Sequence, residues 1–144
     1  MFMKAALEEA ERSAALGEIP VGAVIVRNGT IIGRGHNRSI VDSDPTSHAE
    51  IVALRKAAAA EQNYRLSGAE IYVTLEPCAM CVGALLHARI SRLVFGAYDS
   101  KAGAAGSALD LTAHRSLNHR IEVNGGLLQE ECSDILQRFF SARR

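Results

Sequence analysis

The chain has 144 residues, of which 48% are apolar and 22% are charged. A chain of this length forms one domain, residues 1–144, with a sizeable buried core. These values exclude a multidomain architecture and an intrinsically disordered protein. The 16 basic and 16 acidic side chains cancel, so any nucleic-acid partner needs a local basic patch.

The cysteine count and the hydropathy pattern bear on the compartment. Three cysteines are an odd number, which argues against a disulfide scaffold and for reduced thiols. No apolar stretch approaches the roughly 20 residues of a membrane span. The first turns carry Glu8, Glu9 and Glu11, where a signal peptide would be apolar. We therefore expect a soluble, cytoplasmic protein.

The hydrophobic pattern predicts helices alternating with strands. Apolar residues at helical spacing from Met3 predict a first helix that ends at Gly17. The Asn28-Gly29 pair predicts a hairpin turn between strands over 21–26 and 30–35. Further along the chain we expect a helix over 48–60, a strand over 69–75, a helix over 79–88, a strand over 92–97, a short strand around Ile121, and a last helix whose apolar face holds Leu128, Cys132, Ile135 and Phe139. This order favours an α/β protein with a mixed sheet between helices.

Two short segments place metal-type ligands at helix N-termini. Cys78 and Cys81 are three residues apart and point the same way on a helix, so one ion can bind both sulfurs. The positive end of a helix favours the thiolate, the form that binds metal. His48 opens the earlier helix and supplies a third ligand. Three protein ligands leave one tetrahedral position for water, as in a catalytic zinc site with one ion per subunit.

Glu50 follows His48 by two residues and is the candidate catalytic residue. Two thiolates and a neutral imidazole cancel the charge of zinc, so the water on the metal is acidified less than on a three-histidine site. A nearby base is then needed. In a regular helix Glu50 would point about 200° away from His48, but at a frayed first turn both can face one cavity. We expect Glu50 to act as general acid and base.

The HAE segment followed by PCxxC is typical of the zinc-dependent nucleoside and base deaminases. Over nearly its full length the chain more specifically resembles the bacterial tRNA adenosine deaminases. The stretches that carry this resemblance are EIPVGAVIV, GHNR, DPTSHAE, NYRL, YVTLEPCAMC, FGAYDSKAGAAGS, NHR and ECSDILQRFF.

The resemblance implies a three-layer α/β/α fold of the cytidine deaminase type, with a central mixed five-stranded sheet. It implies hydrolytic conversion of adenosine to inosine at the wobble position of an arginine tRNA, with release of ammonia. Glu50 would protonate the ring nitrogen and then the leaving amine. It further implies recognition of the anticodon stem-loop and a homodimer with the active site near the interface.

Three residues are candidate substrate contacts in loops. By resemblance the Asn37 amide contacts the target nucleoside, although asparagine also forms Asx-turns in loops. Asp99 is a candidate acceptor for a ribose 2′-hydroxyl and Lys101 a candidate phosphate contact. The alternative interpretation of both is a solvated turn.

The C-terminus adds two further candidates. Adjacent helical residues diverge by about 100°, so with Phe139 on the apolar face, Phe140 is left to stack on a base. Arg143, with Arg144, is either a phosphate contact or part of a frayed tail. A basic rim that compensates for the neutral net charge would comprise Lys101, Arg115, Arg120, Arg138, Arg143, Arg144, His114 and His119.

Two other functions remain open from the sequence. The same zinc motif serves deaminases of a free base or nucleotide, such as guanine or cytosine, but the long C-terminal match disfavours them. A catalytically idle zinc or RNA-binding module would not need Glu50. Cys132 lies on an apolar helix face, so we expect it in the core and not on zinc.

Overall fold

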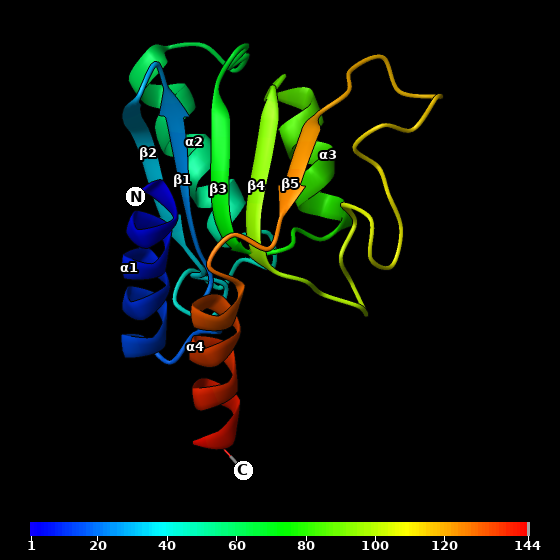
Figure 1. Ribbon diagram of the computed structural model, residues 1–144. Helices are drawn as coiled ribbons and strands as arrows, with labels where there is room; N and C mark the ends of the chain where they lie inside the picture. Colours follow the sequence, from blue (N-terminus) through cyan, green and yellow to red (C-terminus); the bar gives the residue numbers. More distant parts are fainter. Residues whose placement is uncertain (144) are drawn as a thin grey trace.

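The computed structural model describes residues 1–143, and Arg144 lies outside them. Within this range four helices surround one five-stranded sheet (Figure 1). The helices are α1 (Phe2–Ala15), α2 (Ala49–Glu61), α3 (Ala79–His87) and α4 (Gln129–Ser141). The strands are β1 (Gly22–Arg27), β2 (Thr30–His36), β3 (Glu70–Leu75), β4 (Arg92–Ala97) and β5 (Glu122–Gly125). Every element predicted from the sequence is present, with bounds that differ by at most two residues where both were predicted; the short strand expected around Ile121 begins at Glu122.

The sheet has the order β2-β1-β3-β4-β5 and is mixed, as predicted. Strand β1 is antiparallel to β2 and β3, whereas β3, β4 and β5 are parallel. The turn between β1 and β2 has positive φ at both Asn28 (50°) and Gly29 (76°), as a two-residue hairpin requires. The carboxyl ends of β2, β3 and β4 consequently lie at one edge of the sheet.

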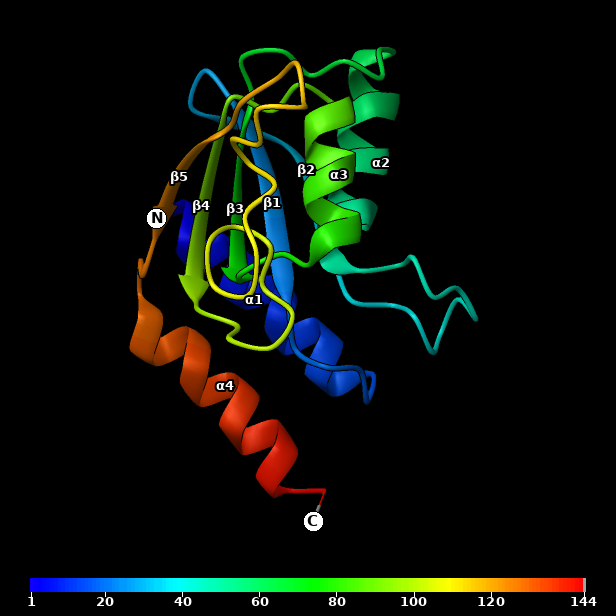
Figure 2. The same ribbon diagram turned by 90° about the vertical axis from the view of Figure 1, so that its right-hand side faces the viewer.

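The helices form the two outer layers. Helices α2 and α3 cover one face of the sheet, and α1 and α4 cover the other (Figures 1 and 2). The larger core cluster lies on the first face and includes Ala53, Ile71 and Leu85. The second face buries Met3 against Cys132, which is fully buried. Cys132 is therefore a core residue, as predicted.

Small residues bring α2 very close to the sheet. A Cβ atom on Gly33 of β2 would lie 2.5 Å from the carbonyl oxygen of Ala53, and one on Gly35 would overlap the carbonyl oxygen of Ala49. Because Gly33 and Gly35 have no side chain, the alanine-rich face of α2 packs directly against the backbone of β2. This contact fixes the N-terminus of α2 beside the carboxyl end of β2.

The carboxyl ends of β2, β3 and β4 and the N-termini of α2 and α3 meet at the same edge. Ligands of α/β sheets commonly bind at such edges. The long connection predicted between β4 and β5 runs from residue 98 to residue 121 and starts at this edge (Figure 2). No helix within residues 1–143 is long and apolar enough to cross a membrane.

Candidate active site and metal centre

The three predicted metal ligands lie together at the sheet edge. His48 is the N-cap residue of α2, Cys78 is the N-cap residue of α3, and Cys81 lies in the first turn of α3. Their ligand atoms all lie within 4.8 Å of one another. His48 Nδ1 is 3.7 Å from Cys78 Sγ and 3.5 Å from Cys81 Sγ. Nitrogen and sulfur ligands of one tetrahedral zinc are about 3.5 Å apart, so the geometry and the donor types both fit zinc.

Hydrogen bonds lower the pKa of Cys78, which favours the thiolate that binds metal. Bonds from Cys81 and His48 to the sulfur lower the pKa of Cys78 to about 4, so it is a thiolate at neutral pH. The hydrogen bond to Cys78, together with burial, raises the pKa of Cys81. The bond to Cys78 also raises the pKa of His48. A zinc ion would replace these shared protons and leave both sulfurs as thiolates.

Glu50 lies in the first turn of α2 and is only 4% exposed. Burial raises the pKa of its carboxyl group to about 7. A carboxyl group with a pKa near neutral both accepts and donates a proton readily. His48 has an extended backbone (φ −72°, ψ 157°), so it precedes the helix and the 200° separation of a regular turn does not apply.

A cavity of about 200 Å³ lies over these groups. An apolar cavity of about 150 Å³ holds a benzene ring, so this one suits a single heteroaromatic base. Its lining consists of Ile19, Val21, Asn37, His48, Glu50, Leu75, Glu76, Cys78, Asp99 and Ala102. Metal ligands, a buried carboxyl group and two of the predicted substrate contacts therefore border one space.

Asn37 uses its amide within the protein. Its Oδ1 accepts a hydrogen bond of 2.9 Å from the backbone N–H of Ala49, and its Nδ2 donates one of 3.0 Å to the carbonyl oxygen of Ile19. Ser13 Oγ donates to the Asn37 carbonyl oxygen at 3.0 Å. Asn37 also lines the cavity, and its amide has a second N–H beyond the two hydrogen bonds that it forms within the protein.

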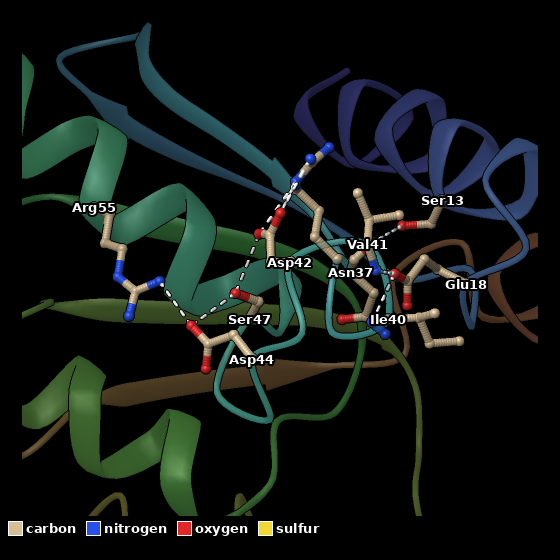
Figure 3. Close-up of polar contacts among 10 residues, drawn as sticks. Ser13, Glu18, Asn37, Ile40, Val41, Asp42, Asp44, Ser47 and Arg55 are labelled. Atoms are coloured by element: carbon tan, nitrogen blue, oxygen red, sulfur yellow. Dashed lines mark hydrogen bonds and ion pairs between the residues drawn. The ribbon is translucent and has the colours of Figure 1, made fainter.

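The loop after β2 is held by a buried carboxylate (Figure 3). Glu18 is 2% exposed, and its Oε2 accepts hydrogen bonds from the backbone N–H groups of Ile40 (2.9 Å) and Val41 (2.8 Å). The side chains of Ile40 and Val41 stay exposed. On the other side of the loop, Asp44 pairs with Arg55 at 3.6 Å.

A second groove of about 360 Å³ adjoins the cavity and shares Ile19, Asn37 and His48 with it. Ile40 lines one part of the groove, and Phe139 and Arg143 of the C-terminal region line another. The guanidinium carbon of Arg143 lies 3.5 Å from the centroid of the Phe139 ring. Arg143 is thus next to the candidate site, as its predicted role requires.

Of the remaining predicted contacts, one lines the cavity and two do not. Asp99 lines the cavity, and its Oδ1 accepts backbone hydrogen bonds from Lys101 and Ala102, both at 3.1 Å. Lys101 is exposed on this turn. Phe140 is 47% exposed and packs edge-on against Phe139. Among residues 1–143, neither Lys101 nor Phe140 belongs to the lining of the cavity or the groove.

Part of the predicted basic rim is engaged within the protein. Arg138 pairs with Asp134 at 2.8 Å and with Glu11 at 3.7 Å. His119 Nε2 donates to the carbonyl oxygen of Ile90 at 2.7 Å. Arg115 and Arg120 are exposed. Arg144 lies outside the described residues.

Two charged lining residues, Glu18 and Glu76, were missed by the sequence interpretation. Each is a charged residue in an apolar context, directly before Ile19-Pro20 and Pro77-Cys78 respectively. Glutamate is almost never fully buried unless it is partnered, but only the fold identifies those partners.

The site and the fold define a class of zinc-dependent deaminase. Residues 1–97 match the family described as the cytidine and deoxycytidylate deaminase zinc-binding region, and the chain belongs to this family. Within it, the chain belongs with the tRNA-specific adenosine deaminases. It is 58% identical to the tRNA-specific adenosine deaminase of Haemophilus influenzae over an alignment of 144 positions, which covers 99% of this chain and 83% of that protein.

Solved structures agree with this placement. A structure from work on A-to-I editing by tRNA:A34 deaminases at the wobble position of transfer RNA superposes with a TM-score of 0.91. It is 44% identical and covers 94% of this chain and 98% of its own. The guanine deaminase of Nitrosomonas europaea has a TM-score of 0.84 at 26% identity, over 97% of this chain and 83% of its own. The predicted fold type is confirmed.

Proposed function

We propose that this protein hydrolytically deaminates adenosine to inosine at the wobble position of tRNA and releases ammonia. The observation that carries the proposal is the buried carboxyl group of Glu50 at the wall of a base-sized cavity that also holds His48 and Cys78. The relatives named tRNA-specific adenosine deaminase support the choice of substrate. Arginine tRNA is the substrate we propose, read through its anticodon stem-loop.

The chemistry divides between the metal centre and Glu50. Zinc, which His48, Cys78 and Cys81 would hold, would supply Lewis-acid activation of a water molecule. Glu50 accepts one proton from the attacking water and delivers it to the ring nitrogen next to C6 of adenine. A bond forms between the water oxygen and C6, and Glu50 then carries the remaining proton of that oxygen to the amine. The C6–N bond breaks, ammonia leaves and inosine remains.

The other predicted residues hold the substrate. We propose that the free N–H of Asn37 and the carboxylate of Asp99 contact the nucleoside in the cavity. Lys101 and Arg143 contact phosphate, and Phe140 stacks on a base next to the target. Lys101→Ala would then lower the dependence of tRNA affinity on salt by about one counterion. An unchanged salt slope would remove Lys101 from the binding surface.

The assembly and location follow from the same proposal. We propose a homodimer with the active site near the interface, which sedimentation at micromolar concentration tests, since a monomer there contradicts it. The proposed compartment is the cytoplasm, which contains the tRNA and keeps the zinc-binding thiols reduced.

A comparison of turnover on different substrate classes tests the proposed function. Zinc-loaded protein is incubated with an arginine tRNA that has an ACG anticodon, with free guanine and with cytidine, and the products are identified by mass spectrometry. The matched control is the same tRNA with guanosine at the wobble position. Inosine at that position of the first tRNA alone supports the proposal. Turnover of only a free base or nucleoside contradicts the substrate while keeping the zinc chemistry.

A further inference from the structure

Glu76 is a buried carboxylate beside the metal centre that the proposed chemistry does not use. It follows the last residue of β3 and stands two residues before Cys78. Its backbone N–H donates to the carbonyl oxygen of Ala97 at 2.9 Å, and the residue is 2% exposed. Among residues 1–143 it forms no ion pair. Its side-chain oxygens instead accept hydrogen bonds.

All donors to this carboxylate come from one segment, residues 99–107. Oε1 accepts a bond of 3.0 Å from the backbone N–H of Asp99 and one from the hydroxyl of Ser107. Oε2 accepts bonds of 3.1 Å from the backbone N–H groups of Ala105 and Ser107. An ionised carboxylate offers about four acceptor sites, so all are occupied. A glutamine amide would direct its own N–H₂ group at N–H donors.

The segment is wrapped tightly around Glu76. A Cβ atom on Gly103 would overlap the carboxyl carbon of Glu76 and lie 2.5 Å from the carbonyl oxygen of Asp99. The backbone N–H of Ala104 donates to the carbonyl oxygen of Pro77 at 2.8 Å. Only bare backbone fits at Gly103, so the contact between carboxylate and segment is specific.

The same segment forms a wall of the cavity through Asp99 and Ala102. Between residues 98 and 121 the chain has no helix or strand, apart from a single bridge between Ala105 and Asp110. The position of this wall therefore depends on Glu76, which ties it to the strand that leads into Cys78.

We propose that Glu76 is a positioning residue that acts through residues 99–107 to set the width of the base cavity, and hence which purines react. This inference rests on the proposed deaminase function. Loss of the four hydrogen bonds would let Asp99 and Ala102 move away from the metal ligands. The cavity would then hold adenine less precisely and reject a purine with an additional amino group less strictly.

The test compares Glu76→Gln with Glu122→Gln, a change in the exposed residue that opens β5. Both zinc-loaded proteins are assayed on an RNA stem-loop with either adenosine or 2-aminoadenosine at the reactive position. We expect kcat on adenosine to fall about 10-fold to 100-fold in Glu76→Gln, because small misplacements of a substrate have effects of this size. The preference for adenosine over 2-aminoadenosine should fall at least about fivefold, with unchanged zinc content. Glu122→Gln should match the wild type.

Hydrogen exchange supplies a readout that needs no substrate. In Glu76→Gln the amides of Asp99, Ala105 and Ser107 should exchange faster, whereas those of the sheet should not. Should this variant fail to fold, Ser107→Ala gives a milder version, because it removes only the hydroxyl bond to Oε1 and keeps the backbone bonds.

Equal loss of kcat/KM on both substrates, or unchanged exchange at the three amides, would overturn the proposal. A wild-type protein that is inactive on the stem-loop contradicts the proposed function instead. In that case the exchange data still decide whether Glu76 holds the wall.

Discussion

Asn37 Oδ1 accepts a hydrogen bond of 2.9 Å from the backbone N–H of Ala49. Ala49 stands between the metal ligand His48 and the buried Glu50, so this bond holds the turn that carries both. The same amide donates to the carbonyl oxygen of Ile19. The Asn37 side chain thus connects the end of the hairpin with the residues before β1 and with the first residue of α2.

Asn37→Ala should weaken both the fold and the site. The change removes a side-chain acceptor at a helix N-terminus, which typically lowers the free energy of unfolding by about 1 kcal/mol. We expect kcat/KM to fall by more than about 10-fold, about 1.4 kcal/mol, because the first turn of α2 loses its alignment. Asn37→Asp is the comparison variant, since it keeps the acceptor for Ala49 but loses both N–H donors, the one to Ile19 and the one that we propose for the nucleoside. Urea unfolding and steady-state kinetics measure the two effects; full activity in Asn37→Ala would contradict the role.

Thiol reactivity should separate the three cysteines. In zinc-free protein Cys78 is a thiolate at neutral pH because its pKa is about 4, and it should be alkylated first. Burial raises the pKa of Cys132 to about 11, so this thiol should react slowly. Zinc should protect Cys78 and Cys81. Iodoacetamide labelling followed by peptide mass spectrometry, with and without a chelator, measures the order. Rapid labelling of Cys78 in zinc-loaded protein would count against it as a ligand.

Two glycine substitutions should have opposite effects on stability. A Cβ atom on Gly96 of β4 would lie 2.8 Å from Cys132 Cβ and 2.9 Å from the carbonyl oxygen of Thr74. Gly96→Ala should therefore lower the free energy of unfolding by about 1–3 kcal/mol and loosen α4. Gly83 lies within α3, where an added Cβ atom would meet nothing within 4 Å, so Gly83→Ala should stabilise the fold by up to about 1 kcal/mol. Denaturant unfolding of both variants is the measurement, and an unaffected Gly96→Ala would refute the close packing.

Asp44 should contribute to acid sensitivity. Hydrogen bonds from the hydroxyl and backbone N–H of Thr46 lower the pKa of Asp44 from 3.8 to about 2. Because the folded-state pKa is the lower one, the carboxylate stabilises the fold fully above pH 3.8, and this stabilisation is lost as the pH falls towards 2. Asp44→Asn should show a shallower loss of stability than the wild type over this interval in unfolding experiments. Identical pH profiles would show that the bonds to Thr46 do not persist in solution.

The fold was largely predictable from the sequence because its signals are local. Asn28-Gly29 specifies a hairpin turn, and the β-branched strands and alanine-rich helix need no distant residues to be recognised. The metal ligands were predictable because Cys78 and Cys81 share one turn. His48 could be proposed as the third ligand because it also opens a helix, but its position beside the cysteines is set by the fold, since they lie 30 and 33 positions further on.

Other parts of the site depend on contacts across the fold. In the sequence Glu76 directly precedes Pro77 and Glu18 stands two residues before Pro20, but the hydrogen-bond partners of both are 22 to 31 residues away. His48 and Glu50 were expected to face one cavity at a frayed first turn, and both line the cavity because His48 precedes the helix with an extended backbone. Phe139 is both the core residue expected from helical spacing and part of the groove lining, because the groove runs along the end of α4.

We propose that Glu50 moves protons for a zinc-dependent conversion of adenosine to inosine in tRNA. The most direct measurement is a single-turnover assay of wild type and Glu50→Gln on arginine tRNA with an ACG anticodon, at equal measured zinc content. Glutamine keeps the size of the side chain but cannot exchange the proton, so inosine formation should fall at least about 100-fold. Zinc binding should be unchanged. Inosine formation at the wild-type rate in zinc-loaded Glu50→Gln would contradict the account.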